Sequence, residues 1–142
     1  MFGDIFFRNS SLPAVMKSLD AAMLRQRAIA NNIANVNTPG YRRVEVAFEG
    51  ELQKALDRTR LKGDKTDDDH LPIGRKDVAH VHPKAWRPVD WSLPSGVNNV
   101  DIDTEMAKLA ENQIMFNYGA RFVKGAYRKL NAAIQARSIP DQ

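Results

Sequence analysis

A long stripe of apolar residues in the last third of the sequence constrains the fold more than any other feature. From Ile102 to Ile134 the steps between its members alternate between four and three, and only Gln113 is polar. This spacing keeps the side chains on one face of a helix and is typical of a coiled-coil seam. It predicts a helix from about Thr104 to Ala136, with Asp101 or Asp103 capping its start. Its packing residues are Ile102, Met106, Leu109, Gln113, Phe116, Ala120, Val123, Tyr127, Leu130 and Ile134.

A second stripe near the start of the sequence predicts another long helix, from about Leu12 to Asn35. Its steps are also threes, fours and sevens, with Gln26 as the one polar interruption. Ser10 or Ser11 can cap this helix, because a serine hydroxyl accepts from the free N–H groups of a first turn. Its packing residues are Val15, Leu19, Ala22, Ile29, Ile33 and Val36.

The end of this helix is crowded with side-chain amides and then stopped by a turn. Pro39 drives Thr38 out of the helical region, and Gly40 can take the positive φ that a type II turn needs. The amides can cap the helix end within one chain, or pair with the backbone of a neighbouring subunit. Both alternatives stay open. The turn motif comprises Asn32, Asn35, Asn37, Thr38, Pro39, Gly40 and Tyr41.

The middle of the chain is less regular. An extended stretch over 41–48 is expected, then a short helix that places Phe48, Leu52, Ala55 and Leu56 on one face and ends near Arg60. Residues 61–100 contain clustered aspartates and several prolines, which predicts an irregular polar insertion with short extended pieces around Trp86 and Trp91.

The predicted fold is mainly α. Two long terminal helices pack as an antiparallel coiled-coil hairpin, accompanied by a short helix and an irregular, partly extended middle insertion. Residues 1–60 carry the first helix, the turn and the short helix. Residues 61–100 form the insertion and 101–142 the last helix, so both ends together make one structural domain. The sequence contains no run of 18 apolar residues, so we expect no membrane-spanning helix.

Two long helices alone bury little apolar surface. Flanking residues such as Ile114 and Met115 stay uncovered in a hairpin, and Gly119 and Gly125 each cost about 1 kcal/mol relative to alanine inside a helix. Close approach of another backbone would explain the two glycines, although they can also simply be tolerated. The pattern indicates a subunit of an assembly that is marginally stable alone.

The sequence offers little catalytic chemistry. The absence of cysteine excludes disulfides and thiol catalysis. His80 and His82 could share one face of a strand and bind a metal with His70 and Asp77, but a solvated loop is the favoured interpretation. No phosphate-binding glycine loop or nucleophile elbow is present, so we expect no enzyme activity, metal or cofactor. The net charge of +4 is not gathered into a dense basic patch.

Two stretches resemble a known family. "ANNIANVNTPGYRR" (residues 30–43) is similar to the N-terminal signature of bacterial flagellar axial proteins, the rod and hook family. "GVNNVDIDTEMAKLAENQIMFNYGARFVKGAYRKLNAAI" (residues 96–134) resembles more narrowly the proximal rod members of that family. The likeness covers residues 10–60 and 96–137.

This resemblance implies a structural, self-assembling subunit of the flagellar basal body that builds a tubular drive shaft for motility. It implies terminal helices that fold on assembly, torque transmission, and a channel through which other subunits are exported. The implied partners are copies of the chain, the adaptor FliE and the MS-ring protein at the base, and rod proteins of the FlgC, FlgF and FlgG type.

The implied location is the rod on the periplasmic side of the inner membrane, reached through the flagellar type III export gate without signal cleavage. The start of the chain lacks the pattern of a cleavable secretory signal. Phe2 to Phe6 resembles a short export signal, or else packs on a neighbour. The alternative function is a soluble helical adaptor, or a basic hairpin protein associated with nucleic acid.

Overall fold

The computed structural model describes residues 11–57, 77–89 and 97–135. In this part of the chain the fold is mainly helical, with one two-stranded sheet. None of the described helices is apolar enough over a sufficient length to cross a membrane. The elements in chain order are α2 (Leu12–Ala34), β1 (Glu45–Ala47), α3 (Glu49–Leu56), the 3-10 turn η1 (Val78–His80), β2 (Lys84–Trp86) and α4 (Ile102–Ile134).

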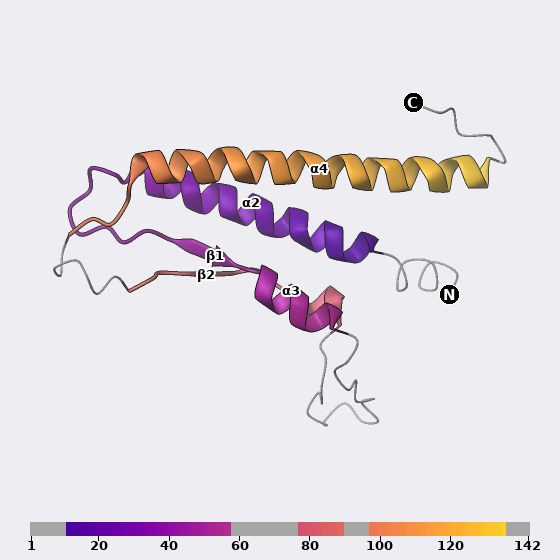
Figure 1. Cartoon of the computed structure of the whole chain (residues 1–142), viewed down its shortest axis with the longest axis horizontal. Coiled ribbons are helices and arrows are strands. Elements are labelled where there is room, and N and C mark those ends of the chain that lie inside the picture. Colours follow the sequence, from indigo (N-terminus) through magenta and orange to yellow (C-terminus); the bar gives the residue numbers. More distant parts are fainter. Residues whose placement is uncertain (1–10, 58–76, 90–96, 136–142) are drawn as a thin grey trace, which may run out of the picture.

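Helix α2 lies between the longer helix α4 on one side and a layer of β1, β2, α3 and η1 on the other (Figure 1). The two long helices run in opposite directions. Asn32, near the end of α2, contacts Glu105 near the start of α4, and Ala22 contacts Asn112 one heptad further along α4. Because α4 has 33 residues and α2 has 23, α4 extends beyond its partner.

Both long helices confirm the sequence prediction, with corrections at their ends. The side chain of Ser11 makes no capping hydrogen bond, and its backbone carbonyl accepts from the N–H of Val15 instead. Helix α4 starts two residues earlier than expected. Its cap is Asp101, which accepts from the N–H of Asp103 at 3.1 Å and from the Thr104 hydroxyl at 2.6 Å. These acceptors satisfy donors of the first turn that have no partner within the helix.

The chain after the turn is extended, as expected, and β1 pairs antiparallel with β2, placing Val46 opposite Ala85. Strand β2 includes Trp86, one of the two tryptophans expected in extended pieces. Helix α3 ends at Leu56 and not near Arg60, because Asp57 already has an extended backbone. Helix α4 ends at Ile134, two residues before the expected Ala136. Several predictions concern parts of the chain outside the described residues: the Ser10 cap, Phe2 to Phe6, the aspartate run, His70 and Trp91.

The hydrophobic core is small and lies beneath α2. Its buried cluster consists of Ala21, Phe48, Ala55 and Val81, with Leu52 and Val78 packed against it. Two of the four cluster residues are alanines, and η1 lies against both α2 and α3. Helix α2 therefore buries one face on this layer and another on α4, whereas the three residues of β2 are all exposed.

Candidate functional site

Asn32 occupies the centre of the molecule's main polar site. Its side chain is fully buried, and its Oδ1 accepts from the N–H of Val44 at 2.8 Å while its Nδ2 donates to the Val44 carbonyl at 2.9 Å. The amide thus pairs with a peptide group as a neighbouring strand would. This pairing ties the end of α2 to the segment that leads into β1.

The remaining hydrogen-bonding capacity of Asn32 is also used. Its Nδ2 donates to Glu105 Oε2 at 2.9 Å, and its Oδ1 accepts from the Tyr41 hydroxyl at 3.2 Å. A side-chain amide can make four hydrogen bonds, so Asn32 is saturated. Glu105 is 1% exposed and also lies 3.3 Å from Lys108 Nζ, which compensates its buried charge.

Two other asparagines satisfy the carbonyl groups at the end of α2. Asn35 Nδ2 donates to the Asn31 carbonyl at 2.8 Å, and its Oδ1 accepts from the Thr38 hydroxyl at 3.2 Å. Asn98 Nδ2 lies 2.8, 2.7 and 3.0 Å from the carbonyls of Asn35, Val36 and Thr38. Asn98, just before α4, thus supplies a donor to the C-cap residue Asn35 and to the turn that follows α2.

The turn itself has the predicted backbone. Gly40 has a φ of 71°, and the N–H of Tyr41 lies 3.3 Å from the Thr38 carbonyl. Beyond the turn, Asn99 Oδ1 accepts from the N–H of Arg43 at 2.8 Å. We call Asn32, Asn35, Asn98 and Asn99 the asparagine clamp.

Two amides of the predicted turn motif find hydrogen-bond partners within the single chain. Asn32 and Asn35 make their hydrogen bonds within the chain, whereas Asn37 and Pro39 are exposed. Sequence reasoning missed Asn98 and Asn99 as members of the site. The available signal was the pair Asn98 and Asn99, which lies directly before the start of α4. Asn98 Oδ1 also accepts from the N–H of Val100, two residues further along.

The face of α4 that contacts α2 is displaced from the expected stripe. Glu105 contacts Asn32, Asn112 donates to the Ala22 carbonyl, and a Cβ built on Gly119 would lie 2.9 Å from Leu19 Cδ2. These three α4 residues recur every seven positions, one residue before the corresponding members of the stripe. Glu105 and Asn112 are the buried residues of α4.

The stripe residues consequently divide into three sets in the single chain. Leu109, Phe116, Ala120, Val123 and Leu130 are half-buried, as are Val15, Leu19, Ile33 and Val36 of α2. Ala22 and Ile29 are buried. The exposed set consists of Ile102, Met106, Gln113, Tyr127 and Ile134.

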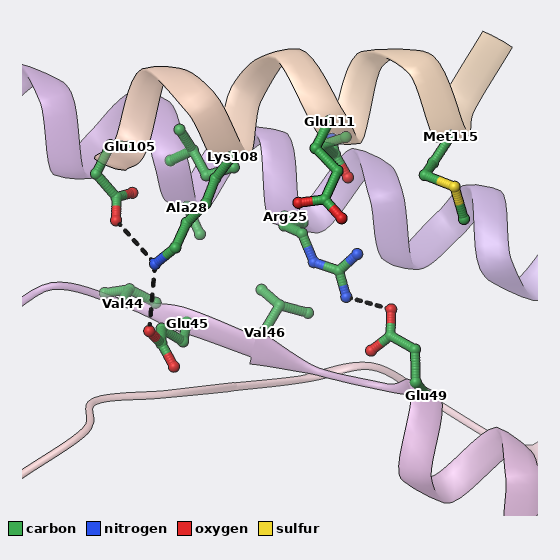
Figure 2. A pocket seen from close by; sticks show the side chains of 12 residues that line it. Arg25, Ala28, Val44, Glu45, Val46, Glu49, Glu105, Lys108, Glu111 and Met115 are labelled. Atoms are coloured by element: carbon green, nitrogen blue, oxygen red, sulfur yellow. Dashed lines mark hydrogen bonds and ion pairs between the residues drawn. The ribbon is translucent and has the colours of Figure 1, made fainter. Parts of the chain in front are cut away.

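An open groove lies between α4 and β1, over the surface of α2 (Figure 2). Its volume is about 530 Å³, and Ala28, Ile29 and Val46 give it an apolar lining. Arg25 bridges it with a 2.6 Å contact to Glu49. Partial burial raises the pKa of Glu49, but the Arg25 hydrogen bond and backbone hydrogen bonds outweigh this effect, so its pKa lies below the usual value.

Three of the four candidate metal residues, His80, His82 and Asp77, lie within the described chain. His80 and His82 are exposed, and Asp77 caps η1 by accepting from the N–H of Ala79. Within residues 11–57, 77–89 and 97–135, no three histidine, aspartate or glutamate side chains are grouped to hold an ion.

Comparison with known proteins gives consistent matches. Residues 16–42 match the family described as flagella basal body rod protein. The chain is 34% identical over 122 residues to the flagellar basal body rod protein FlgB of Borreliella burgdorferi, covering 82% of this chain and 90% of that protein. It is 32% identical over 117 residues to FlgB of Bacillus subtilis, covering 82% and 87%. It is 26% identical over 136 residues to FlgB of Escherichia coli K12, covering 90% and 95%.

Proposed function

Because the chain belongs to the FlgB family of flagellar basal body rod proteins, we propose that its clamped helix pair is the unit from which a tubular rod is built. The protein is a structural subunit of the flagellar basal body rod and not an enzyme. This assignment replaces the alternatives of a soluble adaptor and of a hairpin protein associated with nucleic acid.

The observation that carries the proposal is the exposed apolar surface of α4. Met115 and Tyr118 are 64% and 67% exposed, and Met106, Ile114 and Phe122 are at least half exposed. Ile114, Met115, Tyr118 and Phe122 lie on one side of the helix, and monomeric soluble proteins rarely expose large contiguous apolar patches. Burial of these side chains against sister subunits supplies the driving force for assembly at roughly 25 cal/mol per Å² of apolar area.

The asparagine clamp makes the turn end of the subunit compatible with a dry interface. A helix end buried between subunits costs free energy wherever a carbonyl or N–H group loses water without gaining a partner. Asn32 and Asn98 already supply such partners inside the chain. We therefore propose that this end enters the rod wall with the Val44 peptide group and the carbonyls of Asn35, Val36 and Thr38 already satisfied.

In the assembled rod, the long helices of neighbouring subunits pack as coiled coils along the predicted stripes. Close-packed helices resist deformation, which suits a shaft that transmits torque and encloses an export channel. We place the chain in the proximal rod, on the periplasmic side of the inner membrane. Its proposed contacts are sister copies, FliE and the MS-ring protein at the base, and FlgC-, FlgF- and FlgG-type rod proteins.

We further propose that the chain passes unfolded through the type III export gate, without signal cleavage, and completes its folding on assembly. The small core beneath α2 supports this proposal, since few buried apolar residues make a separate subunit marginal. Circular dichroism of the dilute chain should show less helix than α2, α3 and α4 provide together. A compact, fully helical monomer that melts cooperatively and does not associate would contradict it.

The rod function is tested by replacing the native gene with a Met106→Asp variant. Met106 is exposed, so the aspartate leaves the single chain intact but places an unpaired charge in a buried interface of the rod. We expect cells without rods in purified basal bodies and without motility. The control is Gln53→Asp on the exposed surface of α3, which should assemble normally. Normal rods with Met106→Asp would refute the burial of Met106 in a rod interface.

A further inference from the structure

Helix α4 carries a second regular seam that lies beside the residues facing α2. Its members are separated by steps of four and three, so they form one continuous line along the helix. No element of the described chain covers its central part, where Tyr118 and Phe122 are both at least half exposed. We call this line the open seam. It consists of Glu111, Met115, Tyr118, Phe122, Gly125 and Lys129.

The open seam begins inside the groove between α4 and β1. Glu111 and Met115 line that groove, and Figure 2 shows both side chains reaching from α4 towards it. Seam and groove are therefore one surface, with the apolar residues of α2 and β1 as its floor. The groove residues of α4 span 105–115, about 15 Å along the helix axis at 1.5 Å per residue. This length accommodates between two and three turns of another helix.

The groove end of this surface is acidic. Four carboxylates line the groove against two bases. Arg25 and Lys108 are engaged by Glu49, Glu45 and Glu105, whereas Glu111 is exposed and has no ion pair among the described residues.

A buried acceptor in the groove also lacks a partner. Asn112 is 3% exposed and donates through Nδ2 to the Ala22 carbonyl. Its Oδ1 has no hydrogen-bond partner within the part of the chain that the structure describes. Buried acceptors without a donor are uncommon and call for a physical explanation. A donor brought by a molecule in the groove provides one.

The other end of α4 has the opposite charge. From Asn112 to Ile134 the helix contains no acidic residue, and its basic residues are Arg121, Lys124, Arg128 and Lys129. All four are exposed, and none has an ion pair among the described residues. Gly125 lies among them, and no atom lies within 4 Å of the position that a Cβ would occupy there. This part of α4 therefore offers donors, positive charge and room for close backbone approach.

We infer that the groove receives the basic half of α4, residues 121–129, from a second copy of the chain. Its guanidinium and ammonium groups face Glu111 and the unsatisfied Asn112 Oδ1, while Phe122 packs on the apolar floor. The occupant cannot come from the same chain, because residues 121–129 continue the straight helix that forms the groove wall. The inference rests on the proposed rod function and specifies which surfaces of two subunits meet.

This arrangement joins two different surfaces, the acidic groove of one subunit and the basic helix half of the next. Such a contact is heterologous, so each added subunit offers a new free groove. When the rotation does not close into a ring, repetition gives an open helical polymer. The charge polarity of α4 accordingly sets the direction in which successive subunits join, because a reversed neighbour would place acidic ends together.

Charge reversal with rescue tests the contact in the full-length protein. Glu111→Lys and Lys129→Glu should each weaken subunit association about tenfold, since an attraction becomes a repulsion. The double variant, which exchanges the two charges, should recover most of the lost rod assembly. Asp20→Lys, the same reversal at an exposed position of α2, is the matched control and should assemble normally. A double variant no better than the two single variants overturns the inference.

Disulfide trapping gives the second measurement, because the natural chain has no cysteine. Full-length Glu111→Cys and Lys129→Cys chains are expressed together, and their basal bodies are isolated and oxidised. The two positions lie about 27 Å apart along one helix, so a link between them reports two chains. We expect a disulfide-linked dimer only when both variants are present.

The outcomes separate this inference from the rod function. Rods that contain both cysteine variants but no link between them overturn the inference and leave the rod function intact. A link from the Glu111→Cys chain to a different rod protein also overturns it, since the occupant is then not a second copy. Failure of the unmodified chain to enter rods overturns the proposed function itself.

Discussion

Asn32 and Val44 are joined by two hydrogen bonds, one in each direction, at 2.8 and 2.9 Å. The Asn32 side chain thereby makes the two hydrogen bonds with the Val44 peptide group that a neighbouring strand would make in a sheet. This relationship fixes the angle at which the chain leaves the turn, because both polar groups of Val44 are committed to a single amide. The position of β1 relative to α2 then follows.

Replacement of Asn32 by alanine should destabilise the folded chain strongly. The Val44 peptide group and the Glu105 carboxylate would each lose a buried partner, and one unsatisfied buried group costs about 1–3 kcal/mol. We expect a loss of roughly 3 kcal/mol in the free energy of unfolding, measured by urea denaturation of the associated protein. Asn37→Ala provides the matched control, because Asn37 is exposed and should change stability by less than about 0.5 kcal/mol. Equal effects of the two variants would refute the clamp.

Phe116→Asp should abolish assembly and motility. Phe116 is half-buried and lies between Asn112 and Gly119 on the face of α4 that contacts α2, so a carboxylate there loses water without gaining a partner. The cost is about 2 kcal/mol. Asn117→Asp introduces the same charge at the next position, which is exposed. Cells that carry this variant should swim normally. Motility in soft agar and rod content of basal bodies provide the readouts, and a motile Phe116→Asp strain would contradict the assignment.

The sequence was sufficient to predict the two long helices and the turn because each has strong local signals. Heptad-like spacing predicted α2 and α4 to within two residues at all four ends, and Gly40 has the positive φ that its place after Pro39 required. These features depend on residues close in the chain. Signals from neighbouring residues therefore suffice to locate these elements in the sequence.

The facing surface of α4 could not be predicted in the same way. The alternating four- and three-residue spacing of the stripe favours Met106 and Gln113 as seam positions. The residues that contact α2 are Glu105 and Asn112. Polar residues become buried only when distant partners such as Asn32 satisfy them. Periodicity carries no information about such long-range pairing, and the same reason hid Asn98, whose acceptors lie about 60 positions earlier.

Acid should loosen the start of α4 and the groove. The Thr104 hydroxyl and the Asp103 N–H hold the pKa of Asp101 below its usual 3.8, and the pKa of Glu49 lies below its usual 4.5. A carboxylate with a lowered folded pKa contributes stability above its unfolded pKa and loses it as the pH falls through the folded value. We therefore expect stability to decline below about pH 4.5.

Circular dichroism across pH 2–6 provides the measurement for this acid dependence. Asp101→Asn keeps a capping oxygen but cannot titrate, so it should flatten the part of the decline below pH 3.8. Asp20→Asn removes an exposed carboxylate and should leave the profile unchanged. A decline of the same size in Asp101→Asn and the natural chain would show that this cap does not contribute.

The two glycines of α4 should respond differently to substitution by alanine. At Gly119 the new Cβ would lie 2.9 Å from Leu19 Cδ2, so the gain in helix propensity of about 1 kcal/mol is offset by displacement of Leu19. At Gly125 no atom lies within 4 Å, so the single chain should gain about 1 kcal/mol.

Gly125→Ala should have opposite effects on stability and on assembly. We expect it to stabilise the subunit but to impair formation of the rod. The added methyl group would separate α4 from the groove of the neighbouring subunit, since Gly125 belongs to the open seam. Thermal unfolding measures the first effect, and the yield of rods in basal bodies measures the second. Gly50→Ala on α3 has equally free surroundings and serves as the control, because it should stabilise without loss of rods. A Gly125→Ala chain that is both more stable and fully competent in assembly would show that no second backbone approaches this position.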